Sequence, residues 1–146
     1  MAAMPGPEFR TLHVLVVDDH EPMRVLVTAL LRSMGFEQVL WAADGGDALA
    51  LCRTYKVDLI VTDLMMKPVD GLEFVRRLRA DLSSVSRDAP VVMATGHAQR
   101  EVVIAARAAG VDEFMVKPIT ARALASRVKR ALDPEARAEA KRFYVA

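Results

Sequence analysis

The chain has 146 residues and a formal net charge of +1, from 20 basic and 19 acidic side chains. This balance gives no electrostatic reason to expect binding to nucleic acid, and no apolar stretch is long enough to span a membrane. The single cysteine, Cys52, excludes an internal disulfide framework and is typical of a cytoplasmic protein. Residues 1–10 lack the apolar core of a secretory signal, and we expect a flexible leader there.

The first half of the chain alternates between buried-strand and amphipathic-helix patterns. Residues 12–17 predict a strand that ends at Asp18 and Asp19. A helix follows from Pro22 and ends at Gly35. Residues 39–42 predict a short strand, and Asp44 caps the next helix, which runs to about residue 55. The apolar residues 59–61 predict a strand buried on both faces, and it ends at Asp63.

The second half continues the alternation. A loop over residues 64–70 leads to a helix that ends near residue 80, and a serine-rich loop precedes the strand 91–94. That strand ends at Thr95, and a helix over about 98–109 follows. The last strand, 113–116, ends at Lys117, and Thr120 caps a helix that reaches about residue 132. For the tail, 133–146, we expect a frayed terminus rather than a further short helix.

Some residues are expected to be structural only. Trp41, in the second predicted strand, is interpreted as a packing residue. The arginines at 76, 77 and 79 are interpreted as a solvated helix face.

Five strand–helix repeats of these lengths predict an α/β fold with a parallel sheet covered on both faces. Right-handed crossovers leave few topologies. Among them we predict the flavodoxin-like, three-layer (βα)5 sandwich with strand order 2-1-3-4-5. The predicted domain covers residues 11–132, between the leader at 1–10 and the tail at 133–146.

Polar side chains stand at the carboxyl ends of four predicted strands, and in a parallel sheet these ends share one edge. Asp18, Asp19 and Asp63 should therefore meet Thr95 and Lys117. Clustered carboxylates repel one another, and a hard divalent cation such as Mg²⁺ relieves that repulsion. A nucleophilic carboxylate, a metal and a nearby cation are what phosphoryl transfer requires. Taken singly, each aspartate is better explained as a strand-end carboxylate that caps a nearby helix. Together they predict Asp63 as the nucleophile.

At this point the sequence resembles the receiver domain of two-component response regulators, over about residues 11–132. The matching motifs, in chain order, are Val16-Val17-Asp18-Asp19, Thr62-Asp63, Asp70-Gly71, Ala94-Thr95-Gly96 and Phe114-Met115-Val116-Lys117-Pro118. The resemblance implies that a histidine kinase or a histidine phosphotransfer protein donates a phosphoryl group to Asp63. It also implies that Lys117 and Thr95 bind the phosphoryl oxygens.

The metal site is likewise implied by the resemblance. Asp19 and Asp63 would ligate Mg²⁺ (with Mn²⁺ as a substitute) through their side chains, Met65 through its backbone carbonyl, and Asp18 mainly through a bound water. Such a protein catalyses its own phosphorylation and dephosphorylation but turns over no separate substrate.

The switch and the output surface are implied in the same way. Phe114 would be the aromatic residue that moves with the phosphorylation state, and the bond preceding Pro118 would be cis. The output face would span about residues 98–130. We expect this face to contact an unidentified downstream protein, with the chain a monomer or a homodimer that forms on phosphorylation.

The chain departs from the common family pattern at three places. Lys67 stands where the family usually has proline, and Pro68 follows it. Phe114 lacks the hydroxyl group of the more common tyrosine. Met65 and His97 occupy the positions that flank the path of hydrolytic water, and our hypothesis is that the bulk of Met65 slows the loss of the phosphoryl group.

Three alternative functions fit the sequence less well. A pseudo-receiver scaffold should have lost an acidic or lysine position, and none is lost. A phosphatase with an aspartate nucleophile should carry a second aspartate where Met65 stands. A flavin-binding module should have a Ser/Thr/Gly-rich loop after its first strand, where Asp18 and Asp19 would repel a phosphate.

Overall fold

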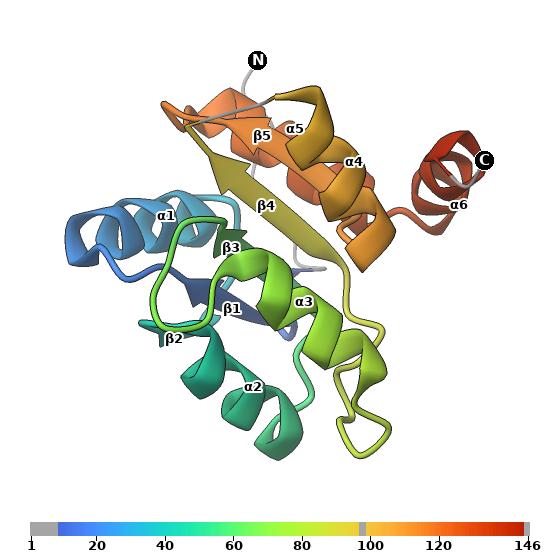
Figure 1. Cartoon of the computed structure of the whole chain (residues 1–146). Coiled ribbons are helices and arrows are strands. Elements are labelled where there is room, and N and C mark those ends of the chain that lie inside the picture. Colours follow the sequence, from blue (N-terminus) through green and yellow to red (C-terminus); the bar gives the residue numbers. More distant parts are fainter. Residues whose placement is uncertain (1–8, 97–98, 145–146) are drawn as a thin grey trace.

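The computed structural model describes residues 9–96 and 99–144. Within them, strands and helices alternate five times and a further helix follows (Figure 1). The strands are β1 (His13–Val17), β2 (Gln38–Ala42), β3 (Leu59–Asp63), β4 (Val91–Thr95) and β5 (Glu113–Val116). The helices are α1 (Glu21–Ser33), α2 (Gly45–Thr54), α3 (Gly71–Ala80), α4 (Arg100–Ala109), α5 (Ala121–Leu132) and α6 (Pro134–Tyr144). Most of the expected leader, His97 and the expected first residue of α4, Ala98, lie outside the described residues.

The five strands form one parallel sheet in the order β2-β1-β3-β4-β5. This order confirms the predicted flavodoxin-like topology. Near the carboxyl edge, the paired residues are Val17 with Thr62, Asp63 with Ala94, and Thr95 with Val116. This register aligns the ends of the four strands that carry the candidate site residues.

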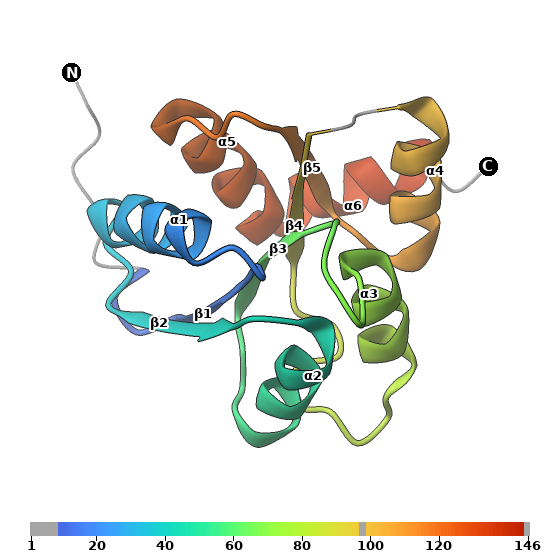
Figure 2. The same cartoon turned by 60° about the vertical axis from the view of Figure 1, so that its left-hand side comes forward.

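Helices cover both faces of the sheet, with α1 and α5 on one side and α2, α3 and α4 on the other (Figure 2). Successive residues of β1 alternate between the two layers. Val14 and Val16 pack with Leu31 of α1 under the first pair of helices, whereas Leu15 and Val17 join the core with α2 and α3. Strands buried on both faces explain why the sequence shows continuous apolar runs rather than an alternating pattern.

Helix ends follow the local signals in the sequence. The Asp44 side chain accepts a hydrogen bond from the Asp47 amide at 2.9 Å, and the Thr120 hydroxyl accepts one from Ala123 at 3.1 Å. These are N-caps, as expected. Helix α1 ends at Ser33, and Gly35 follows with φ = 110°, a conformation that glycine adopts without a Cβ clash.

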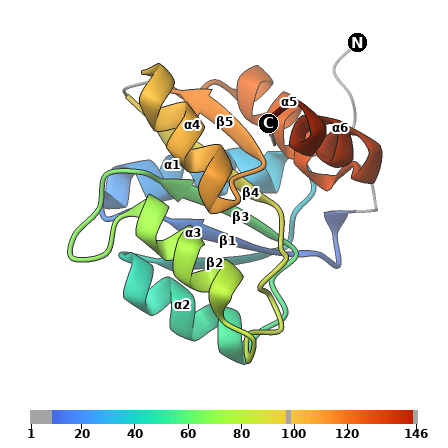
Figure 3. The ribbon, with the colours of Figure 1, turned by 45° about the vertical axis from the view of Figure 1, so that its right-hand side comes forward.

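The expectation of a frayed C-terminus is wrong, because residues Pro134–Tyr144 form helix α6. The Arg137 guanidinium anchors this helix, with Nε donating to Asp112 Oδ1 and Nη2 donating to the Asp88 carbonyl oxygen, each at 2.7 Å. Ala140 is buried beneath the helix. Helix α6 packs beside α5, toward the amino ends of β4 and β5 (Figure 3). Its partners lie far away in the sequence, so the local pattern could not reveal them.

Two structural interpretations from the sequence are corrected. Trp41 is not a core packing residue, since 60% of its surface is exposed on the edge strand β2. Arg79 is not solvated like its neighbours on α3. Its guanidinium is largely buried and donates hydrogen bonds to the carbonyl oxygens of Arg87, Ala89 and Gly110 and to the carboxylate of Asp112. Arg79 therefore ties α3 to the loops that precede β4 and β5.

The packed part of the chain begins before residue 11. Phe9, near the end of the expected leader, stacks on Phe36, with ring centroids 4.7 Å apart.

None of the helices in the described ranges has the length and apolar character of a membrane span.

Candidate functional site

Asp18 and Asp19 stand where β1 gives way to α1. The Asp18 amide donates to the Ala42 carbonyl oxygen at 3.1 Å, which extends the parallel pairing with β2 by one residue. The Asp18 carboxylate is buried and its Oδ1 accepts a hydrogen bond from the His20 amide at 2.9 Å. Asp19 is exposed. One carboxylate is thus fixed in the protein and its neighbour faces the solvent.

Asp63 is the last residue of β3 and its side chain is buried. Its Oδ1 accepts a hydrogen bond from the following Leu64 amide at 2.9 Å. The chain then folds back closely, because the Gly71 amide donates to the Leu64 carbonyl oxygen at 2.9 Å. A Cβ on Gly71 would lie 2.1 Å from the Asp63 carbonyl oxygen, so only glycine fits there. The Asp70 side chain caps α3 through the Glu73 amide.

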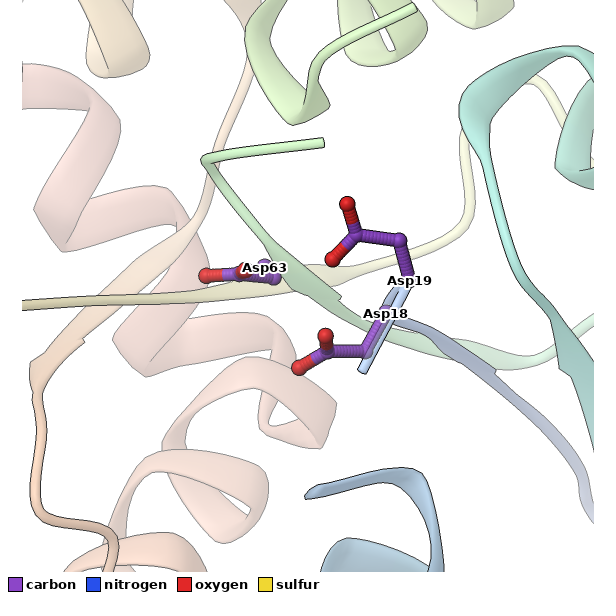
Figure 4. A group of neighbouring side chains, drawn as sticks. All are labelled: Asp18, Asp19 and Asp63. Atoms are coloured by element: carbon purple, nitrogen blue, oxygen red, sulfur yellow. The ribbon is translucent and has the colours of Figure 1, made fainter. Parts of the chain in front are cut away.

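The three carboxylates form one cluster, with an oxygen from each lying within 4.8 Å of the others (Figure 4). Burial raises the pKa of the Asp18 carboxyl above its ordinary value, and the charges of Asp63 and Asp19 raise this pKa further. The His20 amide and the Lys117 ammonium act in the opposite direction. The cluster is therefore an anionic site held together against its own repulsion.

Lys117 supplies a cation to this cluster. Its Nζ lies 3.2 Å from Asp63 Oδ1 and 4.0 Å from Asp18 Oδ2. The Lys117 amide donates to the Thr95 carbonyl oxygen at 2.8 Å, and the peptide bond to Pro118 is cis. Both described contacts of the Asp63 carboxylate, from Leu64 and from Lys117, fall on Oδ1. Within the described residues, Oδ2 carries neither of these two contacts, which leaves it as the oxygen that can attack an electrophile.

The remaining residues selected from the sequence lie around this cluster. Thr95 ends β4 at the same edge of the sheet and is fully buried. Phe114 lies on β5, half-buried, and packs against the core beside Met93, its partner in the register. Met65 is 66% exposed in the loop after Asp63. Lys67 is exposed in the same loop and precedes a cis bond to Pro68.

Sequence reasoning missed one residue that touches the site. Arg24 of α1 donates from Nη1 to the carbonyl oxygen of Asp18 at 2.8 Å. The sequence carried a signal for this residue, because a positive charge near the start of a helix interacts unfavourably with the helix dipole. Such a side chain is expected to make a compensating contact outside the helix, and Arg24 contacts the loop that carries Asp18 and Asp19.

The donor set of the cluster suits a hard divalent cation. Three carboxylates at this spacing could hold a metal ion, and their chemistry is that of an oxygen-only site rather than a thiolate or imidazole site. A bound cation would also offset the free-energy cost of keeping the buried Asp18 carboxylate ionised inside the protein.

Comparisons with known proteins agree with this geometry. A family model described as response regulator receiver domain matches residues 14–129. The chemotaxis protein CheY of Pseudomonas aeruginosa is 36% identical over 119 residues, which cover 82% of this chain and 94% of that protein. Chemotaxis protein CheY-3 of Vibrio cholerae is 36% identical over 121 residues, covering 83% and 92%.

Solved structures show the same likeness. The chemotaxis response regulator CheY4 of Vibrio cholerae has a TM-score of 0.75 at 32% identity, over 83% of this chain and 98% of that chain. The signal receiver domain of a signal transduction histidine kinase from Syntrophus aciditrophicus has a TM-score of 0.74 at 28% identity, over 84% and 90%.

Proposed function

The chain belongs to the response regulator receiver family, and on that premise we propose that it is a phospho-accepting signalling switch with Asp63 as the acceptor. One observation carries this proposal. Asp63 has a lysine ammonium 3.2 Å from one of its carboxylate oxygens and two further carboxylates beside it, at the edge of the sheet where open α/β folds bind ligands. A phosphodonor, a metal and a nucleophile can meet at this point.

The proposed metal is Mg²⁺, with Mn²⁺ as a substitute. Asp19 and Asp63 would hold it through their side chains, Met65 through its backbone carbonyl, and Asp18 through a water molecule. The all-oxygen donor set supports this choice. When bound, the cation supplies positive charge to the phosphoryl oxygens and relieves the repulsion within the cluster.

The residues of the chain account for the transfer step. Asp63 Oδ2 attacks the phosphorus of a phosphohistidine on a histidine kinase or a histidine phosphotransfer protein. The phosphorus–oxygen bond forms as the phosphorus–nitrogen bond breaks, and the imidazole leaves and takes up a proton from water. Lys117, already beside Asp63, neutralises one phosphoryl oxygen, and the Thr95 hydroxyl donates to another. The products are an aspartyl phosphate on this chain and the dephosphorylated histidine of the donor protein.

The proposed signal passes from the site to the surface formed by α4, β5 and α5. Thr95 and Phe114 are on the adjacent strands β4 and β5. In this proposal, a shift of Thr95 toward the phosphoryl group would open space near Phe114. A state that binds the phosphoryl group better becomes more populated on phosphorylation. The downstream protein, or a second copy of this chain, would read that state by direct contact. The chemotaxis proteins among the relatives support an output through protein contact.

The test uses acetyl phosphate as a small phosphodonor. In the presence of Mg²⁺, the wild-type chain should gain one phosphoryl group, measured as intact mass. The gain should disappear when EDTA removes the metal and in the Asp63→Asn variant. Asp58→Asn is a matched control, because Asp58 lies at the opposite end of β3, where its carboxylate accepts a hydrogen bond from the His13 amide. A pseudo-receiver would show no gain in any sample, and a phosphatase would release phosphate continuously.

A further inference from the structure

Arg24 links the metal-site loop to the edge of the sheet. Its Nη1 donates to the Asp18 carbonyl oxygen at 2.8 Å, and its guanidinium carbon lies 4.4 Å from the centre of the Trp41 ring. Trp41 is the only tryptophan in the chain, and 60% of its surface is exposed. The indole face gives the guanidinium a platform, since arginine stacks well on tryptophan. One side chain thus bridges β1, α1 and β2.

Local helix energetics do not account for an arginine at this position. Arg24 is in the first turns of α1, where the exposed amides carry positive charge and favour acidic residues such as Glu21. Its contacts lie outside the helix, on the Asp18 carbonyl and the Trp41 ring. An arginine at this position is therefore explained by its contacts with Asp18 and Trp41 rather than by the helix itself.

Asp18 is held at three different atoms. Its amide donates to the Ala42 carbonyl oxygen, its Oδ1 accepts from the His20 amide, and its carbonyl oxygen accepts from Arg24. Ala42 directly follows Trp41, so the backbone contact and the arginine contact both end on the last two residues of β2. The turn into α1 is anchored to β2 by a main-chain bond and by a side-chain clamp.

We propose that Arg24 is a positioning residue for the metal site and that Trp41 holds Arg24 in place. This inference rests on the proposed function. The carboxylates of Asp18, Asp19 and Asp63 repel one another, and without a restraint the loop between β1 and α1 would relax away from β3. The clamp keeps the ligands near their binding arrangement before a metal arrives, so that less ordering is needed on binding.

The sign of the effect separates positioning from simple electrostatics. Arg24 directs its charge at a backbone carbonyl and an aromatic ring, whereas Lys117 directs its charge at the carboxylates. If Arg24 acted only as a nearby positive charge, its removal would strengthen Mg²⁺ binding, because a competing cation is lost. If Arg24 positions the loop, its removal weakens Mg²⁺ binding.

The experiment measures the dissociation constant of Mg²⁺ by isothermal titration calorimetry at one ionic strength. Arg24→Met should weaken binding about three- to tenfold, the net value of one ordinary hydrogen bond. Trp41→Leu should weaken it about twofold, and adding Trp41→Leu to Arg24→Met should change nothing further. Arg32→Met, on the same helix, is the matched control. Arg32 is exposed and should leave the constant within about twofold of wild type.

An unchanged or lower dissociation constant for Arg24→Met would overturn the inference. If Arg24→Met does not fold, as judged by circular dichroism, Arg24→Lys decides instead. Lysine keeps the charge but cannot serve the carbonyl and the ring with one planar group, so binding should again weaken. Failure of the proposed function looks different, because the wild-type chain itself would then bind no Mg²⁺ that depends on Asp19.

Discussion

Replacing Gly71 with alanine tests how closely the loop after Asp63 must fold back. The new Cβ would lie 2.1 Å from the Asp63 carbonyl oxygen, where contacts under 3.0 Å are essentially never seen. The backbone must therefore open by at least about 0.9 Å. The obstructing atom belongs to the backbone of a central strand and cannot rotate away. Overpacking of this kind costs about 1–3 kcal/mol, and alanine recovers a fraction of that from the unfolded state. We expect a net loss of about 2 kcal/mol in the free energy of unfolding.

Urea denaturation followed by circular dichroism measures this loss. With an m-value of about 2 kcal/mol/M, the midpoint should fall by about 1 M. Gly96→Ala is the matched control, because a Cβ at Gly96 meets no atom of the described residues within 4 Å and should change stability by no more than about 0.5 kcal/mol. Since the displaced carbonyl is that of Asp63, Gly71→Ala should also slow phosphorylation by acetyl phosphate. Equal midpoints for the two variants would refute the reasoning.

Three further changes follow from the structure. Lys117→Met removes the ammonium 3.2 Å from Asp63, so calorimetry should show Mg²⁺ binding about three- to tenfold tighter, while phosphorylation slows; weaker Mg²⁺ binding would contradict this. Met65→Asn should speed the loss of the phosphoryl group several-fold, and an unchanged dephosphorylation rate would end the hypothesis that Met65 crowds the attacking water. Arg137→Met removes two hydrogen bonds that anchor α6, one of them to the buried Asp112. It should lower the unfolding free energy by about 1.5–3 kcal/mol and speed amide exchange in α6, with the exposed Arg142→Met as the control.

The order of strands and helices could be predicted because each of these elements leaves a pattern in its own residues. Strands buried on both faces, such as Val14 to Val17, leave apolar runs that stop abruptly at the sheet edge. Caps such as Asp44 act within three residues. Helix α6 was not expected because every apolar residue between Pro134 and Phe143 is an alanine, which gives only a weak pattern. Its anchor, Arg137, reaches residues 25 and 49 positions away in the sequence.

The residues of the candidate site could also be selected from the sequence, because parallel strands bring Asp18, Asp63 and Lys117 to one edge. The burial and the contacts of these residues could not be predicted in this way. Nothing local indicates that Asp18 is buried while Asp19 is exposed. Likewise, the sequence does not indicate that Trp41 is exposed or that Arg24 contacts it. Their contact depends on the register between β1 and β2, which brings Trp41 opposite Val16. Tertiary contacts of this kind leave no periodic signal.

The most direct measurement locates the phosphoryl group itself. An aspartyl phosphate is an acyl phosphate, and borohydride reduces it to the alcohol, which converts the modified aspartate to homoserine. After phosphorylation with Mg²⁺ and acetyl phosphate, reduction with tritiated borohydride and peptide mapping should place homoserine, and all of the label, at position 63. Label at Asp18 or Asp19, or no label on any aspartate, would contradict the assignment of Asp63 as the acceptor.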